Sequence, residues 1–266
     1  MRQSIQNLIQ PTLAIATHAG LNIMAIYNEY AAQDIGDLHV QTKQDNSPLT
    51  EADLAAHHII AQGLAQLTPD TPVVSEEDAS SLIHRQAQGL FWLIDPLDGT
   101  KEFIARNDEF TVNIALIQDG IPLFGIVSAP ALGLTYWGGI GIGAFRSHNN
   151  ETTPIHVSTP DSQHLLRIVA SKSHMNADTI DFINQLGTHE LVQAGSSLKF
   201  CRVAEGAADY YPRLGLTSEW DTAAAHAIVE AAGGYVYQLN GTPLHYGKTE
   251  LLNPYFVAAN RPYQFS

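Results

Sequence analysis

The sequence predicts an α/β protein of two closely associated halves, and three observations support this fold class. In the first third of the 266-residue chain, apolar residues recur every three or four positions, which is typical of amphipathic helices. Residues 109–155 are short β-rich runs separated by Asp-Gly and glycine-rich turns, a pattern that favours an antiparallel sheet. After residue 160, strand-like and helix-like segments alternate.

The N-terminal part of the chain is expected to begin with two helices. The first is indicated by an apolar stripe made of Leu13, Ala16, Ala19, Ile23, Ile26 and Tyr30. The second is expected from Thr50 to Ala65, because Thr50 can cap it with Asp53 at its third position. The strands expected after these helices are Pro72–Val74, Leu90–Ile94, Thr111–Ile117, Pro122–Ser128 and Thr135–Trp137.

A boundary between the halves is expected within Ser147–Pro160, which is rich in Ser, Thr, Asn and Pro. Residues 1–150 would form an N-terminal α+β half with most of the candidate metal ligands. Residues 151–266 would form a C-terminal α/β half with Asp221 and candidate substrate-binding residues. The elements expected in this half are strand Arg167–Ala170, helix Ala177–Gln185, strand Glu190–Gln193, a helix from Leu198, strand Ala208–Pro212, helix Asp221–Ala232 and a strand after Gly233 and Gly234.

Composition excludes several classes of protein. With 13 basic and 27 acidic residues the net charge is −14, so a basic nucleic-acid-binding surface is not expected. No apolar run approaches the ~20 residues of a membrane-spanning helix, and Met1–Gln10 lacks the apolar region of a secretory signal. Cys201 is the single cysteine, so no intrachain disulfide can form, and we expect it to pack in the core. These features favour a cytoplasmic protein without an integral membrane segment, and leave peripheral association with the inner membrane open.

The strongest chemical signal is the run Trp-Leu-Ile-Asp-Pro-Leu-Asp-Gly-Thr that begins at residue 92. An apolar strand leads here into Asp95 and Asp98, and these two carboxylates with the carbonyl of Leu97 would form a hard oxygen site that suits Mg²⁺. The N–H groups of Gly99 and Thr100, at an expected helix start, can hold a phosphate oxygen. An aspartate-rich turn that caps a helix would have the same local pattern.

Two further acidic clusters lie far away in the sequence. Ser75–Asp78 follows an expected strand, and Glu219–Asp221 opens an apolar helix. Taken singly, the first is explained as a solvated loop and the second as a helix cap. Taken together, the three clusters could converge, and a carboxylate shared between two ions would build a two-metal site for phosphoryl transfer. The spacing of an EF-hand calcium loop is absent.

The three clusters resemble the motifs of the inositol monophosphatase family, which consists of lithium-sensitive, magnesium-dependent phosphatases. The match runs in the expected order from about residue 45 to residue 234, and its motifs are Asp95–Thr100, Glu76–Glu77, Trp220–Ala224 and Ala232–Gly234. The resemblance implies a layered αβαβα sandwich. One departure is Ala225, where a glycine often follows the Ala-Ala pair in relatives. Because alanine is also small, we expect little effect from this difference.

The resemblance also implies a set of metal ligands. Glu76, Asp95 and the carbonyl of Leu97 would hold the first Mg²⁺ ion, and Asp95, Asp98 and Asp221 would hold the second. Glu76 would contribute to a third, weaker ion through water. The cofactor expected from this set is therefore two to three Mg²⁺ ions.

The resemblance further implies the catalytic residues. Thr100, oriented by Asp53, would help to activate the attacking water, and Glu77 would lie nearby. The mechanism expected is a direct in-line attack of water on phosphorus, without a phosphoenzyme.

Within the family, three more segments are similar to the 3'(2'),5'-bisphosphate nucleotidases of sulfate assimilation: residues 45–53 (DNSPLTEAD), 171–174 (SKSH) and 195–200 (GSSLKF). A bisphosphate keeps one phosphate after cleavage, and Lys199 and Arg213 are suited to bind it. Without the resemblance, both would be explained as surface charges. The residues expected to contact the substrate are Gly99, Thr100, His174, Ser196, Lys199, Arg213 and Asp221.

We therefore predict a phosphatase that removes the 3'-phosphate of adenosine 3',5'-bisphosphate, acting as a monomer or homodimer. An inositol monophosphatase or fructose-1,6-bisphosphatase activity is the alternative within the same class. A non-catalytic metal-binding sensor or scaffold is the alternative from another class. The presence of Thr100, Asp53, Glu76 and Glu77 speaks against the last alternative.

Overall fold

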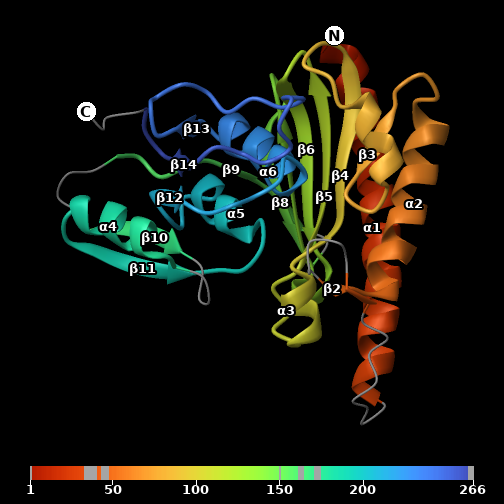
Figure 1. Cartoon of the computed structure of the whole chain (residues 1–266), viewed down its shortest axis with the longest axis horizontal. Coiled ribbons are helices and arrows are strands. Elements are labelled where there is room, and N and C mark those ends of the chain that lie inside the picture. Colours follow the sequence, from red (N-terminus) through yellow and green to blue (C-terminus); the bar gives the residue numbers. More distant parts are fainter. Residues whose placement is uncertain are drawn as a thin grey trace.

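The computed structural model describes residues 2–32, 41–42, 48–149, 151–160, 165–170 and 175–262 of the chain. Residues 45–47 and the whole 171–174 segment, including His174, lie outside the described residues. The architecture of the described residues is a mixed α/β fold with two large sheets and a separate sheet of two short strands (Figure 1). Within the described ranges, no helix combines the length and the apolar character that crossing a membrane requires.

The larger sheet has seven strands in the order β3-β4-β5-β6-β7-β8-β9. Only β3 and β4 are parallel, and every later neighbour in this sheet is antiparallel. The expected division at residue 150 is not tested by this arrangement, although β9 completes the sheet from just beyond it. The strands are β3 (Val73–Ser75), β4 (Leu90–Asp98), β5 (Thr111–Gln118), β6 (Ile121–Ala129), β7 (Leu134–Gly139), β8 (Gly143–His148) and β9 (Glu151–Ile155).

The smaller sheet has five strands in the order β11-β10-β12-β14-β13. The pairs of β10 with β11 and β12 are parallel, and those of β14 with β12 and β13 are antiparallel. The strand β14 was not among the expected elements. These strands are β10 (Leu166–Ala170), β11 (His189–Gln193), β12 (Tyr210–Arg213), β13 (Tyr235–Gln238) and β14 (Phe256–Ala259).

Helices cover both sheets and fill the space between them (Figure 1), which gives the five layers of an αβαβα sandwich. The outer layer on the larger sheet is α1 (Arg2–Ala32) and α2 (Glu51–Leu67), the central layer is α5 (Leu198–Ala204) and α6 (Trp220–Ala231), and α4 (Ala177–Gln185) covers the smaller sheet. The short elements are β1 (Gln41–Thr42), β2 (Pro48–Leu49), α3 (Thr100–Ile104) and the 3₁₀ helices η1 (Ala79–His84) and η2 (Pro130–Leu132).

The alternation of side chains along the strands explains these layers, because successive residues of a strand point to opposite faces of its sheet. In β4, Phe91 and Leu93 pack into the core shared with α5 and α6, whereas Trp92 and Ile94 pack against α1 and α2. In β10, Val169 faces the same central core, while its neighbours face α4. The central core therefore joins the two sheets.

Helix α6 lies unusually close to the larger sheet, because glycine occupies the contact point. A Cβ atom added to Gly125 of β6 would lie 2.1 Å from the carbonyl oxygen of Ala224 in α6. One added to Gly138 of β7 would lie 3.0 Å from the Cβ of Ala231, at the other end of the helix. This contact fixes the height of α6 above the sheet and places its first turn, which contains Asp221, near the end of β4.

Candidate active site

The end of β4 carries the two aspartates that the sequence singles out. Asp95 pairs with Asn113 of β5 and Asp98 pairs with Thr111, and the register of the ladder shifts between these pairs. Proline has no N–H to donate to a ladder, so Pro96 suits this irregularity. The expected strand end at Ile94 was therefore too early, since β4 resumes its pairing beyond Pro96.

A small turn orients the buried carboxylate of Asp95. Its side chain is only 2 % exposed, and its Oδ1 accepts a hydrogen bond of 3.1 Å from the N–H of Leu97. This is the local turn that aspartate commonly forms with its own backbone two residues on. The peptide at Leu97 is thus held beside the carboxylate of Asp95.

The carboxylate of Asp98 is held by several donors on one oxygen. Its Oδ2 accepts bonds of 2.7 Å from both the N–H and the hydroxyl of Ser197, and it lies 3.3 Å from the hydroxyl of Thr111 and 3.4 Å from Nδ2 of Asn113. The Ser197 hydroxyl also lies 2.8 Å from the carbonyl oxygen of Asp221. Ser197 therefore joins the end of β4 to the start of α6.

These supporting residues were not identified from the sequence. Thr111 and Asn113 are 0 % and 1 % exposed, although they lie in an otherwise apolar strand. A polar residue at a position that strand periodicity buries is the signal that could have found them, because buried polar groups need partners.

The turn after Asp98 fits closely against the loop before α5. Gly99 has φ +92°, and a Cβ atom there would lie 2.1 Å from the hydroxyl oxygen of Ser196. That hydroxyl donates to the carbonyl oxygen of Asp98 at 3.0 Å, and Ser196 itself adopts a positive φ of 43°. Glycine is required at residue 99 for both the backbone angle and the close approach.

Thr100 and Asp53 are in direct contact. The Thr100 hydroxyl donates to Oδ1 of Asp53 at 3.1 Å, and Asp53 is 0 % exposed. The other oxygen of Asp53 accepts from the N–H of Thr50 at 2.8 Å and from its hydroxyl at 2.6 Å. Thr50 is thus the N-cap residue of α2, as expected, and Asp53 at the third helical position binds both Thr50 and Thr100.

The pairing of β3 with β4 brings the acidic loop after β3 next to Asp95. Ser75 pairs with Ile94 in parallel, and the N–H of Glu76 lies 3.3 Å from the carbonyl oxygen of Ile94, which sets Glu76 beside Asp95. The N–H of Glu77 donates to the Ser75 hydroxyl at 3.2 Å. The same hydroxyl lies 2.8 Å from Nδ1 of His57, whose pKa is lowered by burial.

The carboxylates of the three clusters interact strongly. Burial raises the pKa of Asp95 well above its usual range, and the charges of Glu76, Asp98 and Asp221 and a side-chain hydrogen bond with Glu76 add to the rise. Burial and the charges of Asp98 and Glu76 likewise raise the pKa of Asp221, against the opposing effects of the Ser218 N–H and Arg213. Carboxylates from three distant segments therefore lie close enough to repel one another.

The chemistry of this donor set fits a hard divalent cation. Among the described residues, no three Asp, Glu, His or Cys side chains form a ready-made metal-binding arrangement. Instead, burial, the neighbouring charges and a side-chain hydrogen bond with Glu76 raise the pKa of Asp95 and so favour its protonated form. A cation such as Mg²⁺, which prefers carboxylate oxygens, would replace that proton and relieve the repulsion.

A pocket of about 80 Å³ lies beside these carboxylates and contains two cationic side chains. Lys199 is only 8 % exposed, and burial, with a contribution from Arg213, lowers its pKa to about 8 although Asp98 opposes the change. Within the described residues, Nε of Arg213 is buried without a hydrogen-bond partner, and its Nη2 donates to the Leu216 carbonyl at 3.0 Å. The pocket is lined by Asp98, Ser196, Lys199, Phe200, Tyr211, Arg213, Thr217, Asp221 and Thr222.

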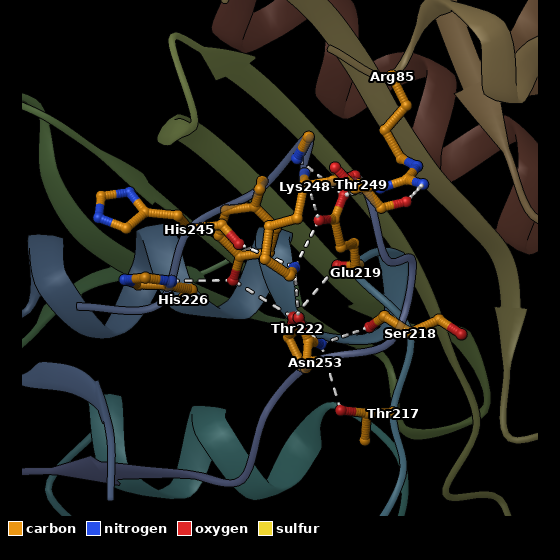
Figure 2. A network of polar contacts seen from close by, with 12 residues as sticks. Arg85, Thr217, Ser218, Glu219, Thr222, His226, His245, Lys248, Thr249 and Asn253 are labelled. Atoms are coloured by element: carbon orange, nitrogen blue, oxygen red, sulfur yellow. Dashed lines mark hydrogen bonds and ion pairs between the residues drawn. The ribbon is translucent and has the colours of Figure 1, made fainter. Parts of the chain in front are cut away.

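The structure thus brings together most of the residues that the sequence singled out. Gly99 and Ser196 touch at the rim, and Cys201 is buried in the core, as expected. The expected contribution of His174 falls outside the described residues. Glu219, the first residue of the third acidic cluster, is 0 % exposed and belongs to a separate polar network (Figure 2).

Comparison with known proteins agrees with this fold. The inositol monophosphatase family model matches residues 6–263. The 3'(2'),5'-bisphosphate nucleotidase CysQ of Escherichia coli K12 is 46% identical over 250 residues, which cover 94% of this chain and 98% of that protein. The crystal structure of CysQ from Bacteroides thetaiotaomicron has a TM-score of 0.83 and 39% identity, covering 96% of this chain and 98% of that one. The inositol monophosphatase of Anabaena, at 24% identity, shares the fold with a TM-score of 0.74, over 97% and 92% of the two chains.

The raised pKa values predict how the metal-free protein responds to pH. An acid whose pKa is higher in the folded state contributes stability below its unfolded pKa of ~3.9, and this stability is lost as the pH rises through the folded value. At pH 7 without Mg²⁺, Asp95→Asn should therefore unfold at a higher temperature than the wild type, because it removes one repelling charge. Excess Mg²⁺ should reduce or reverse the difference. Thermal unfolding followed by circular dichroism measures both effects.

Asp209→Asn is the matched control, because the pKa of Asp209 is shifted in the opposite direction from that of Asp95. Burial raises the pKa of Asp209, but hydrogen bonds from Arg167 and Ser158 outweigh it and lower the pKa. This variant should lose stability at pH 7, with or without Mg²⁺. Equal destabilisation in Asp95→Asn and Asp209→Asn would show that Asp95 is not repelled by neighbouring negative charges.

Proposed function

Because the chain belongs to the inositol monophosphatase family, we propose that it is a Mg²⁺-dependent phosphatase that converts adenosine 3',5'-bisphosphate to AMP and phosphate. One observation supports this most strongly. A group of mutually repelling carboxylates, suited to cations, adjoins a pocket with two cationic side chains, suited to an anion. The names of the curated relatives, 3'(2'),5'-bisphosphate nucleotidase, support the same substrate.

The cleaved phosphate would lie over the acidic cluster. Glu76, Asp95, the Leu97 carbonyl, Asp98 and Asp221 would hold two to three Mg²⁺ ions, whose charge would neutralise the phosphoryl oxygens. The hydrogen bonds on Oδ2 of Asp98 and on Oδ2 of Asp221 fix the direction of each carboxylate. Such outer hydrogen bonds orient ligands before a metal arrives.

Thr100 and Asp53 would orient the attacking water. Because the Thr100 hydroxyl donates its hydrogen to Asp53, its oxygen is left to accept a hydrogen bond from water. Thr50 fixes Asp53 with two hydrogen bonds, so the acceptor position of Thr100 is set by the start of α2. The proposed role of Glu77, next to the cluster, is to assist this water. The water would then attack phosphorus in line with the leaving ribose oxygen.

The phosphate that stays on the product would lie in the pocket of Lys199 and Arg213. At about 80 Å³ this pocket suits a group of phosphate size and is too small for a whole nucleotide. The Ser196 hydroxyl and the N–H groups of Gly99 and Thr100 are proposed as further contacts, as is His174. Local positive charge would let a protein of net charge −14 bind a polyanion. A cytoplasmic location and a monomeric or dimeric state stay predictions.

Thr100→Ala tests the catalytic role of this hydroxyl. The variant should lower kcat by ~100-fold or more, because it removes help with proton transfer and water orientation. KM should change little, since the variant keeps the backbone N–H of Thr100 that is proposed to contact a phosphate. Steady-state phosphate release at saturating Mg²⁺ measures both constants. A raised KM with an unchanged kcat would make Thr100 a binding residue instead.

Lys199→Met and Arg213→Met test the substrate. Each should lower kcat/KM for adenosine 3',5'-bisphosphate by ~10- to 100-fold, the effect of a lost charge-assisted contact. Inositol 1-phosphate, which has no second phosphate, should be affected little. The wild type should also lose kcat/KM for the bisphosphate above about pH 8, where Lys199 gives up its proton, and Lys199→Met should not.

Arg261→Met is the control, because Arg261 lines a different pocket. All reactions are run with and without Mg²⁺. Parallel losses on both substrates would contradict the bisphosphate assignment. A wild type that prefers inositol 1-phosphate would favour the inositol monophosphatase alternative.

A further inference from the structure

Glu219 has a position that its sequence context does not explain. It directly precedes α6 and lies two residues before Asp221, where an acidic side chain commonly caps a helix. Its side chain makes no capping bond and is 0 % exposed. It points instead toward the 245–253 loop and Arg85 (Figure 2).

Each oxygen of this carboxylate accepts a backbone hydrogen bond and pairs with a cation. Oε2 accepts from the N–H of Gly247 at 2.9 Å and lies 3.3 Å from Nη1 of Arg85. Oε1 accepts from the N–H of Lys248 at 3.1 Å and forms an ion pair with its ammonium group. One buried anion thus binds two cations and two backbone donors from distant parts of the chain.

The network controls the backbone that orients Asp221. The N–H of Asn253 donates to the Thr217 carbonyl at 2.8 Å, and its Nδ2 donates to the Ser218 carbonyl at 2.7 Å. Ser218 in turn donates its N–H to Oδ2 of Asp221 at 2.8 Å. A loop attached to Glu219 therefore holds the peptide that aims a carboxylate of the acidic cluster.

The network also reaches the loop that carries Glu76. Arg85 directly follows η1, and its guanidinium donates to the carbonyl oxygens of Lys248 and Thr249. In the first half of η1, the Ser81 hydroxyl accepts from the N–H of Ser75 at 3.0 Å. The short segment between Ser75 and Arg85, which contains Glu76, is thus fixed at both ends.

We propose that Glu219 is a positioning residue for the acidic cluster: it ties the α6 start, the 245–253 loop and the η1 segment together so that Asp221 and Glu76 face the same point. A buried ion pair contributes little net stability compared with apolar packing, so geometry is the better explanation for its presence. The inference rests on the proposed function, because it assumes that the cluster binds Mg²⁺. Each carboxylate needs an anchor, since the cluster repels itself before a cation arrives.

Glu219→Gln tests this role, with Glu205→Gln as the matched control. The Glu205 side chain is only 6% exposed, and it also pairs with two cations, Arg146 at 3.0 Å and Arg202 at 2.6 Å. Two readouts are compared: the Mg²⁺ concentration that gives half the thermal stabilisation, and the Mg²⁺ concentration that gives half-maximal phosphate release. Glu219→Gln should require about 10-fold more Mg²⁺ in both, the usual effect of losing an outer partner of a metal site. Glu205→Gln should require the wild-type concentration, even if it is equally destabilised.

Equal Mg²⁺ requirements in Glu219→Gln and Glu205→Gln would overturn the inference. If Glu219→Gln does not fold, Arg85→Met decides, because it leaves the Glu219–Lys248 pair balanced: a raised Mg²⁺ requirement supports the inference and a wild-type requirement refutes it. A wild type that binds Mg²⁺ but does not cleave the bisphosphate would refute the proposed substrate alone, and the thermal readout would still test Glu219. A wild type whose unfolding ignores Mg²⁺ would overturn the inference itself.

Discussion

The repulsion among the carboxylates of Glu76, Asp95, Asp98 and Asp221 is the constraint on which the rest of the site depends. Burial and neighbouring charges both raise the pKa of Asp95 and Asp221, so folding must hold these groups where they would otherwise separate. Ser197 holds Asp98 against the start of α6, and Ser218 holds Asp221. The close contact of α6 with Gly125 sets the distance between the α6 start, with Asp221, and the larger sheet, with Asp95 and Asp98. The folded protein thus holds like charges close together, and a divalent cation is suited to neutralise them.

The same geometry places an acidic and a basic environment side by side within one small region. On one side the carboxylates would collect cations, and on the other Lys199 and Arg213 face the pocket. The low pKa of Lys199 and the unpartnered Nε of Arg213, within the described part of the chain, indicate that neither cation is fully satisfied by its neighbours. A ligand with two phosphates would place one against the cations at the carboxylates and the other against Lys199 and Arg213. This is the physical basis of the proposed substrate.

Local signals in the sequence were sufficient where neighbouring residues decide the structure. Helix α4 spans Ala177–Gln185 as predicted, and Asp53 accepts from Thr50 at the start of α2 as its spacing suggested. Tertiary contacts decide the rest. The extension of β4 beyond Pro96 depends on pairing with β5, and β14 is recognisable mainly by its partners β12 and β13. The sequence alone does not predict the contacts of Glu219, because its partners lie 28 or more residues away.

We propose that the carboxylates of Glu76, Asp95, Asp98 and Asp221 form a divalent metal site. Anomalous diffraction from crystals grown with Mn²⁺, which accepts the same oxygen ligands as Mg²⁺, tests it most directly. We expect at least one strong peak bonded to Asp95 together with Asp98 or Asp221, and the loss of this peak in Asp95→Asn crystals. Anomalous peaks only elsewhere, with none bonded to Asp95, Asp98 or Asp221 at saturating Mn²⁺, would contradict it.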